Sequence, residues 1–223
     1  MLDVLDELSD LVLTLLGFAL VLAIIGLATG LERALGLSKE DTRKLVHVGV
    51  GHWILLAPFI DDLRWALVAP VAFIGLNWLS HRRGTFGAME RSEGADTLGT
   101  VFYSVSLTLV VLALFREDQP RWVAVAAIMV MAWGDGLAAV VGTRWGRHPY
   151  RGPGGTKSVE GSAAMLVAST VVVLLCQQLG AGAIRPGVAL AVAAVATLLE
   201  ACSPRGTDNL SVPLSTAALL VLL

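Results

Sequence analysis

The sequence predicts an all-α fold, a polytopic integral membrane bundle of seven or eight transmembrane helices that forms a single domain over residues 1–223. Composition is the first reason: 56% of the residues are hydrophobic and only 15% are charged, whereas soluble domains are about a quarter charged. The second reason is that the charges lie mostly between long uncharged runs. Two cysteines exclude a disulfide framework, and a net charge of -2 gives no basic field for nucleic acid.

Each predicted span is a run with few or no charges and a length close to that of the hydrocarbon core. The first has 21 uncharged residues, and about 20 are needed to cross. The fifth is interrupted only by Asp135, and the last has just 14 residues, so seven full spans and a half-span remain an alternative. In order, the spans are 11–31, 45–60, 64–80, 97–115, 122–143, 161–184, 186–200 and 210–223.

The positive charges predict the orientation of these spans. The connections after the odd-numbered spans carry 12 Lys and Arg residues, whereas the other side carries four, namely Arg64, Arg116, Arg121 and Arg185. Because cytoplasmic loops are enriched in Lys and Arg, the amino terminus is expected outside and the odd connections in the cytosol. In a prokaryote the membrane would be the plasma membrane.

With this topology, four separated segments bring their polar residues to the cytosolic face. Ionisable residues within spans are rare and usually functional. Cations and carboxylates that meet on one face indicate a site for a phosphorylated polar ligand. The residues concerned are Arg43, Lys44, His47, Asp135, Lys157, Glu160, Glu200, Asp208 and Asn209.

A glycine-rich stretch, Gly152 to Gly155, precedes the sixth span and predicts an anion-binding loop. Glycine lets backbone N–H groups approach phosphate oxygens closely. Lys157 would add a positive charge, and Ser158 suits the start of a helix whose positive end faces the phosphates. The stretch is not a Walker A loop, because Thr156 separates the last glycine from the lysine.

Two carboxylates beside this loop are candidate ligands for Mg²⁺ or a similar divalent cation. Asp135 and Glu160 offer hard oxygen atoms, and Mg²⁺ prefers one or two carboxylates together with phosphates and water. Other interpretations stay open. Asp135 could pair with Arg144, Lys157 could pair with Glu160 on one helix face, and Arg43 and Lys44 could simply anchor the topology.

These motifs resemble the CTP-dependent polyprenol kinase family, which includes dolichol kinase, phytol kinase and the CTP-using diacylglycerol kinase. The matching pieces are Arg43 to Gly51, Gly134 to Gly146 and Lys157 to Ser162, with a weaker fourth formed by Glu200, Asp208 and Asn209. The resemblance implies a membrane-embedded kinase that transfers the γ-phosphate of CTP to the hydroxyl of an isoprenoid or other lipid alcohol, such as phytol, farnesol, geranylgeraniol or dolichol. The choice of CTP comes from the resemblance alone.

The predicted site combines both lines of reasoning. We expect catalytic roles for Asp135, His47 and Lys157, with Asp135 or His47 accepting the proton, and metal ligation by Asp135, Glu160 and Glu200. Asp96 and Tyr103 are expected to line the path of the lipid hydroxyl. The expected nucleotide contacts are Arg43, Lys44, Gly152, Gly154, Gly155, Lys157, Ser158, Glu160, Gly161, Ser162, Asp208 and Asn209.

Two other functions fit part of the sequence. A phosphatidate cytidylyltransferase shares the Asp and Lys-Ser-x-Glu-Gly pieces, but its charged carboxy-terminal signature is missing from residues 210–223. A secondary transporter for an anionic solute would also place charges within broken spans, yet no inverted repeat is visible. The expected partners are therefore a nucleotide, a lipid alcohol and the surrounding membrane lipids, and the sequence does not predict an oligomeric state.

Overall fold

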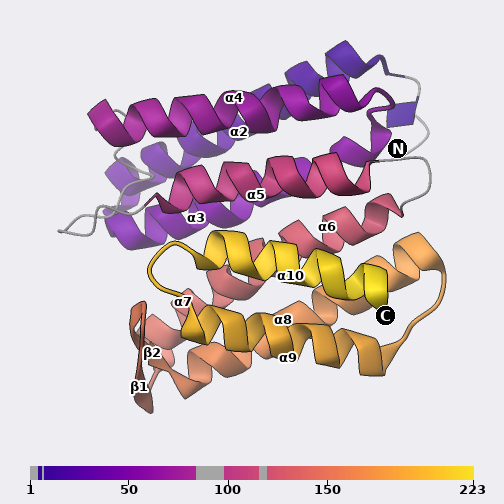
Figure 1. Cartoon of the computed structure of the whole chain (residues 1–223). Helices are drawn as coiled ribbons and strands as arrows, with labels where there is room; N and C mark the ends of the chain where they lie inside the picture. The colour runs from indigo at the N-terminus through magenta and orange to yellow at the C-terminus, as the bar shows by residue number, and fades with distance from the viewer. Residues whose placement is uncertain (1–4, 7, 84–97, 116–119) are drawn as a thin grey trace.

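The computed structural model describes residues 5–6, 8–83, 98–115 and 120–223, and these residues form a bundle of helices that run roughly side by side (Figure 1). The all-α prediction is confirmed, because the regular elements of the described chain are helices apart from one two-stranded hairpin. The start of α2 (Asp10–Leu35) and the end of α10 (Asp208–Leu222) lie at the same end of the bundle.

The amino-terminal half contributes α2 (Asp10–Leu35), α3 (Lys39–Gly51), α4 (Leu63–Arg83) and α5 (Gly99–Leu114). The second predicted span, 45–60, differs from the structure: α3 begins six residues earlier and continues after Gly51 only as short 3-10 turns. It begins early because the Ser38 hydroxyl caps it, accepting a hydrogen bond from the Asp41 N–H at 3.1 Å. The 3-10 turns are η1 (His52–Leu55) and η2 (Ala57–Phe59).

The carboxy-terminal half is built around one long interrupted helix. It consists of α6 (Arg121–Met129), a π-helical segment labelled η4 (Val130–Asp135) and α7 (Gly136–Trp145). The strands β1 (Pro149–Gly152) and β2 (Gly155–Ser158) then form an antiparallel hairpin. The chain ends with α8 (Val159–Cys176), the π turn η5 (Gln177–Ala181), α9 (Pro186–Cys202) and α10 (Asp208–Leu222).

The predicted count of seven or eight membrane spans is not confirmed when both length and hydropathy are required of the helices among the described residues. Four helices meet both conditions: Asp10–Leu35, Leu63–Arg83, Arg121–Trp145 and Val159–Gly180. Three further apolar helices, α5, α9 and α10, are shorter. The described residues therefore support a membrane protein with several apolar helices, but they do not confirm a count of seven or eight spans.

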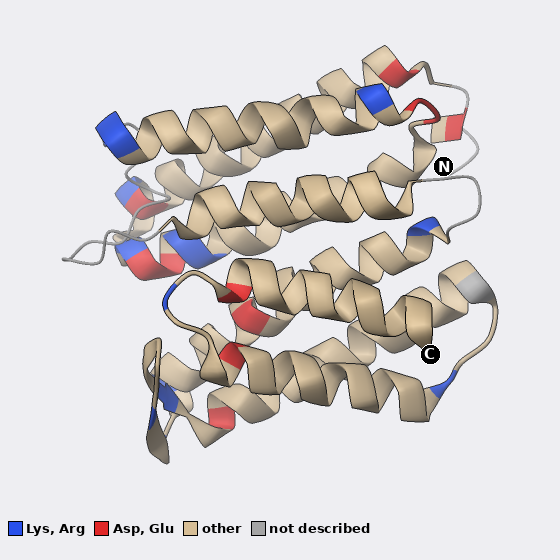
Figure 2. Ribbon diagram, viewed as in Figure 1, with Lys and Arg blue, Asp and Glu red and all other residues tan. Residues whose placement is uncertain are grey.

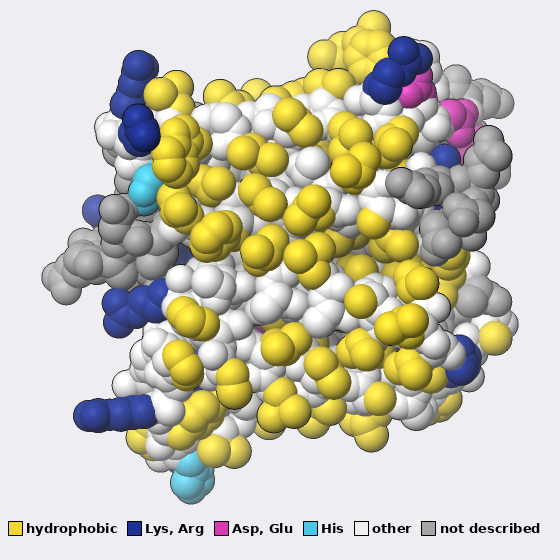
Figure 3. Space-filling model, in the orientation of Figure 1, with side chains coloured by type: hydrophobic (Ala, Val, Ile, Leu, Met, Phe, Trp, Pro, Cys, Tyr) yellow, Lys and Arg dark blue, Asp and Glu magenta, His cyan; other side chains and the backbone are white. Residues whose placement is uncertain are grey.

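The core lies along α6, which is the most enclosed part of the bundle. Val123, Ala124 and Ile128 have no exposed surface. The outer helices instead present large apolar side chains such as Leu15, Leu22 and Leu198, each more than half exposed. Figure 3 shows apolar side chains spread over the middle of the visible face, and Figure 2 shows charged residues gathered toward the two ends. A bundle with an apolar exterior and charged ends is suited to a bilayer.

Candidate active site

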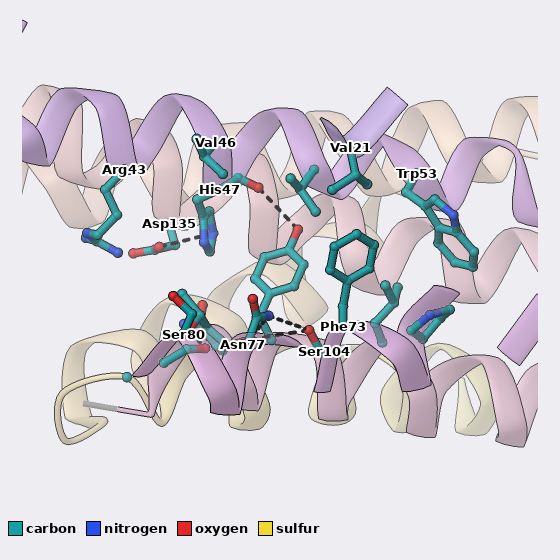
Figure 4. Close-up of a pocket in the computed structure, with 18 of the residues that line it drawn as sticks. Val21, Arg43, Val46, His47, Trp53, Phe73, Asn77, Ser80, Ser104 and Asp135 are labelled. Carbon is teal, nitrogen blue, oxygen red and sulfur yellow. Dashed lines mark hydrogen bonds and ion pairs between the residues drawn. The ribbon is translucent and has the colours of Figure 1, made fainter. Parts of the chain in front are cut away.

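A buried ion pair joins the two halves of the bundle. Lys44 of α3 places its Nζ atom 2.6 Å from Oδ2 of Asp135 at the end of η4, and His47 Nε2 lies 3.3 Å from the same oxygen. The Lys44 and Asp135 side chains are only 8% and 10% exposed. Figure 4 shows His47 and Asp135 pointing toward each other with Arg43 beside them. A carboxylate at this depth is stabilised by its cationic partner.

The π-helical segment and the glycines on either side of Asp135 explain how it reaches this position. A π turn inserts an extra residue into a helix and often occurs at functional sites. A Cβ atom at Gly136 would collide with Val48 of α3, and one at Gly134 would lie 2.7 Å from the Ser169 hydroxyl of α8. Glycine at both positions therefore allows neighbouring helices to approach closely around the carboxylate.

Two further carboxylates approach Asp135 from α9 and α10. Asp135, Glu200 and Asp208 each offer one oxygen, and these three oxygens lie within 4.8 Å of one another. Glu200 is near the end of α9 and Asp208 opens α10, so the short connection between the two helices brings both side chains to the cluster. Three hard oxygen donors at this spacing fit a divalent cation such as Mg²⁺.

A second lysine neutralises the other side of this cluster. Lys157 of β2 places Nζ 2.5 Å from Oε1 of Glu200 and also donates to the Glu200 main-chain carbonyl. The hairpin holds Lys157 there through its register, in which Tyr150 pairs with Lys157 and Gly152 with Gly155. The three carboxylates are thus flanked by Lys44 on one side and Lys157 on the other.

The predicted glycine loop is the turn of this hairpin. Gly155 has a φ of 123°, a backbone conformation that favours glycine. Gly152 and Gly154 lie against main-chain carbonyls of Ala201 and Ser203, where a Cβ atom would have no room. The glycines therefore seat the hairpin on the connection between α9 and α10.

Helix α8 begins at the capping residue predicted for it. Ser158 accepts a hydrogen bond from the Gly161 N–H at 3.1 Å, and the Val159 N–H donates to the His148 carbonyl. These two N–H groups already have hydrogen-bond partners within the protein, so they are not free to donate to a bound anion. Gly161 also lets α8 approach α7, because a Cβ atom there would lie 3.3 Å from the Gly142 Cα.

Two pockets meet at the ion pair. The first, of about 420 Å³, extends between α3, α4 and α5, and we call it the amphipathic pocket because its lining changes from charged to apolar. The second, also of about 420 Å³, lies between α7, the hairpin and the start of α8, and we call it the polar pocket. Both pockets are lined by Arg43, Lys44, Asp135 and Asp208.

Such an arrangement can bring an anionic ligand and an apolar one to the same point. The polar pocket adds Lys157, Ser158 and Arg205 to the shared residues. Cations beside a carboxylate cluster that could hold a metal ion are the kinds of group that phosphoryl transfer requires, because that reaction depends mainly on positioning and charge neutralisation.

Comparison with known proteins identifies relatives with the same kind of chemistry. A phytol kinase of Synechocystis sp. is 42% identical over 181 residues, which cover 80% of this chain and 77% of that protein. The chain belongs to the CTP-dependent polyprenol kinase family. The family predicted from the sequence motifs is therefore confirmed. No family model and no solved structure matches the chain.

Other relatives of this polyprenol kinase family member are named for different lipid alcohols. A chloroplastic farnesol kinase of Arabidopsis thaliana is 30% identical over 56% of this chain and 44% of its own length. A CTP-dependent diacylglycerol kinase 1 of Schizosaccharomyces pombe is 27% identical over 57% of this chain and 62% of its own length. All three relatives are named as kinases of a lipid alcohol.

Most of the predicted site residues of this family member lie around the two pockets. Arg43 lies between them and pairs with Glu40 at 2.5 Å. Tyr103 lines the amphipathic pocket and donates a hydrogen bond to the His47 carbonyl at 3.2 Å. Asn209 also lines that pocket and donates from Nδ2 to the Gly99 carbonyl at 3.0 Å. Ser162 lines the polar pocket, where its hydroxyl lies 2.6 Å from that of Tyr150.

Glu160 is placed differently from the prediction. Its Oε1 atom lies 2.6 Å from Nδ1 of His148, and the residue is not among the three clustered carboxylates. Because Ser158 caps α8, Glu160 falls on the first turn of that helix and faces the start of the hairpin. Asp208, expected to contact the nucleotide, occupies the cluster instead. Asp96 lies outside the described residues.

The structure also replaces two of the simpler interpretations. Arg144 lies 3.7 Å from Asp41 and is not the partner of Asp135, which pairs with Lys44. Lys157 pairs with Glu200, not with Glu160. Both pairs found here join segments far apart in sequence, which no local spacing could reveal.

Sequence reasoning missed the polar residues within the amphipathic pocket. Asn77 of α4 donates from Nδ2 to the Ser104 hydroxyl of α5 at 2.9 Å and to the Thr100 carbonyl at 3.1 Å. Ser80 lines the same pocket one turn further along α4. The available signal was the spacing of Asn77 and Ser80, three residues apart in an otherwise apolar span, which places both side chains on one helix face.

Proposed function

We propose that this chain is a membrane-embedded kinase that transfers the γ-phosphate of CTP to the hydroxyl of an isoprenoid alcohol. Kinase relatives that act on phytol, farnesol and diacylglycerol support phosphorylation of a lipid alcohol. The observation that carries the proposal is that the amphipathic and polar pockets meet at Arg43, Lys44, Asp135 and Asp208. Neither a nucleotide nor a lipid would need to leave its own environment to react.

The polar pocket would hold the nucleotide phosphates. Lys157 of β2 and Arg43 of α3 line it, and Arg205 lines it from the α9–α10 connection. Strong positive charge around a triphosphate favours binding and also stabilises the charge that develops in transfer. CTP is proposed as the donor because the diacylglycerol kinase relative is described as CTP-dependent.

Asp135, Glu200 and Asp208 would hold Mg²⁺ or a similar divalent cation. Their clustered oxygens and their partial burial fit such an ion. A bound cation would neutralise phosphate charge during the transfer. Lys44 and Lys157 would then turn from the carboxylates to the phosphates, since both are already beside the cluster.

The alcohol would approach from the amphipathic pocket with its hydroxyl toward Asp135. Its oxygen attacks the γ-phosphorus, the bond from that phosphorus to the bridging oxygen breaks, and CDP leaves. We propose that His47 accepts the hydroxyl proton. His47 lines the amphipathic pocket but not the polar one, whereas Asp135 is shared by both and is paired with Lys44. A positioned base near the attacking oxygen is a general feature of such reactions.

The proposed orientation follows the distribution of positive charge. The reactive groups gather at the end of the bundle where α3, α4 and α7 carry most of their Lys and Arg residues (Figure 2). The positive-inside rule assigns this end to the cytosol, where nucleotides are made. The amino terminus would then lie outside.

The decisive experiment is to incubate the purified protein in detergent with γ-labelled CTP, Mg²⁺ and separate samples of farnesol, geranylgeraniol, phytol, a dolichol and diacylglycerol. We expect label on one or more alcohols together with CDP. Asp135→Asn should lower the rate of phosphate transfer by at least about a hundredfold. Asp62→Asn, at the other end of the bundle, should leave that rate unchanged. Label on none of the alcohols would refute the kinase proposal.

The same experiment separates the alternatives. A cytidylyltransferase would form a CDP-lipid and release pyrophosphate, so that the γ-label would not reach the lipid. A transporter would move a solute into vesicles without any chemical turnover. Neither alternative is favoured by the relatives, which are all kinases.

A further inference from the structure

The amphipathic pocket changes character along its length. Arg43, His47 and Asp135 lie at one end and Trp53 at the other, with Phe73 and Val21 nearby (Figure 4). Between the ends lie Asn77 and Ser104, which are hydrogen-bonded to each other. Such a gradient fits a molecule with a polar head and a long apolar tail.

The direction of the pocket follows from the residues that three helices contribute. On α4 these residues run from Ala69 to His81, and on α5 from Gly99 to Leu107. The stripe on α4 is about 18 Å long at about 1.5 Å of rise per residue. The pocket therefore runs parallel to the helices, and it extends over a little more than half of a hydrocarbon core roughly 30 Å thick.

The apolar end is closed by tightly packed side chains. Trp53 is 2% exposed and Ala69 1% exposed. The Trp53 ring lies directly against Gly17 of α2, where a Cβ atom would collide with it. This contact fixes the indole, so Trp53 cannot simply move aside for a longer ligand.

We propose that Trp53 and Ala69 set the length of isoprenoid chain that the kinase accepts. The proposal rests on the proposed function and adds where the tail lies: along the amphipathic pocket, with its distal end against these two residues. The small Ala69 side chain leaves room for the last part of the tail, and Trp53 limits its extension. Alcohols of different length then differ in how well their hydroxyl can reach Asp135.

Two substitutions with opposite effects test this proposal. Ala69→Leu fills the apolar end, and Trp53→Leu enlarges it. The substrates are geraniol, farnesol and geranylgeraniol, which have two, three and four isoprene units, together with a longer polyprenol. For each pair of variant and alcohol, kcat/KM is measured with γ-labelled CTP.

Ala69→Leu should lower kcat/KM for geranylgeraniol by at least about tenfold relative to geraniol, because added methylene groups in a packed space are poorly tolerated. Trp53→Leu should raise kcat/KM for the longer polyprenol severalfold relative to kcat/KM for geranylgeraniol. Two matched controls are Ala189→Leu in α9 and Leu13→Ala in α2, buried positions that do not line the pocket. Each control should change kcat/KM by the same factor for all of the alcohols.

The outcomes separate this inference from the proposed function. If the unmodified protein phosphorylates the alcohols but Ala69→Leu leaves their ratios unchanged, or lowers all of them equally, the inference is wrong while the kinase stands. If Trp53→Leu fails to fold, the kcat/KM ratios between the alcohols in Ala69→Leu still test the inference. Absence of any phosphorylated alcohol would remove both.

Discussion

Lys44 and Asp135 form an ion pair of 2.6 Å although 91 positions separate them in the chain. The pair joins α3 to the central helix and lies between the two pockets. It therefore links the two halves of the fold and lies beside the groups that would meet both substrates. Substitution of Lys44 can separate these two roles.

Lys44→Met should lower both stability and activity. It leaves the buried Asp135 carboxylate without its partner, which is expected to reduce the free energy of unfolding by about 3–5 kcal/mol. Adding Asp135→Asn removes the unpaired charge, so the double variant should regain much of the stability but none of the activity. Thermal unfolding in detergent and a CTP kinase assay give the two readouts.

An exposed ion pair, between Arg64 and Asp62, serves as the control for this buried pair. Arg64 and Asp62 are also 2.6 Å apart, but the Arg64 side chain is 90% exposed, and exposed pairs contribute little to stability. Arg64→Met should therefore unfold at a temperature close to that of the unmodified protein. A double variant at Lys44 and Asp135 that recovered activity would contradict the proposed role of the pair.

The metal dependence should identify the carboxylate ligands. Asp208→Asn and Glu200→Gln should each raise the Mg²⁺ concentration for half-maximal activity by at least about tenfold, because each removes one oxygen donor from the cluster. Glu160→Gln should not, since Glu160 is paired with His148. A titration of activity with Mg²⁺ measures this, and the opposite ranking would restore Glu160 as the ligand.

His47→Gln should lower kcat by about a hundredfold or more, because the attacking hydroxyl would lose its proton acceptor. The KM for CTP should change little, since His47 lines only the amphipathic pocket. The control is His52→Gln, five residues further along and lining neither pocket. A raised KM for CTP with an unchanged kcat would assign His47 to nucleotide binding.

Close packing of α7 on α8 should make Gly161 sensitive to substitution. In Gly161→Ala the new Cβ atom would lie 2.8 Å from the Ala138 carbonyl oxygen, so the helices must separate and the midpoint of thermal unfolding should fall. Gly187 occupies a similar place near the start of α9 and has no neighbouring atom within 4 Å. Gly187→Ala should therefore keep or slightly raise the midpoint, and equal effects at both sites would argue against this packing.

The orientation can be tested with the natural cysteine at the end of α9. Cys202 is exposed and lies close to Glu200 and the hairpin. In a Cys176→Ser background, a maleimide that cannot cross membranes should label Cys202 in inverted vesicles and leave it unlabelled in intact cells. Labelling from the outside would reverse the proposed topology.

The sequence predicted the fold class, the family and most of the segments that line the two pockets, but not the ion pairs between those segments. Span-length apolar runs and the Gly-Asp-Gly motif are local signals, and they placed Asp135 and Ser158 in their roles as buried carboxylate and helix cap. The partners of Lys44 and Lys157 depend on which helices pack together, and neighbours in space such as Glu200 and Lys157 are 43 positions apart.

Local spacing also explains where the structure differs from the expectation. Glu160 looked like a metal ligand because it follows Lys157 closely, yet the helix that begins at Val159 turns it toward His148. The second span was drawn at 45–60 because hydropathy alone marked its start, whereas the polar turn from Lys39 to Thr42 is helical too. Capping residues would have located that start better than hydropathy did.

The polar pocket and the carboxylate cluster occupy one end of the bundle only, while the apolar end of the other pocket is closed by Trp53. A neutral prenol can move readily between the two leaflets of a bilayer. A phosphate monoester is charged, and moving that charge into hydrocarbon has a large unfavourable free energy. The product would thus be stranded in the leaflet where it was made. If the site faces the cytosol as proposed, the reaction would also make the two leaflets differ in their content of phosphorylated alcohol.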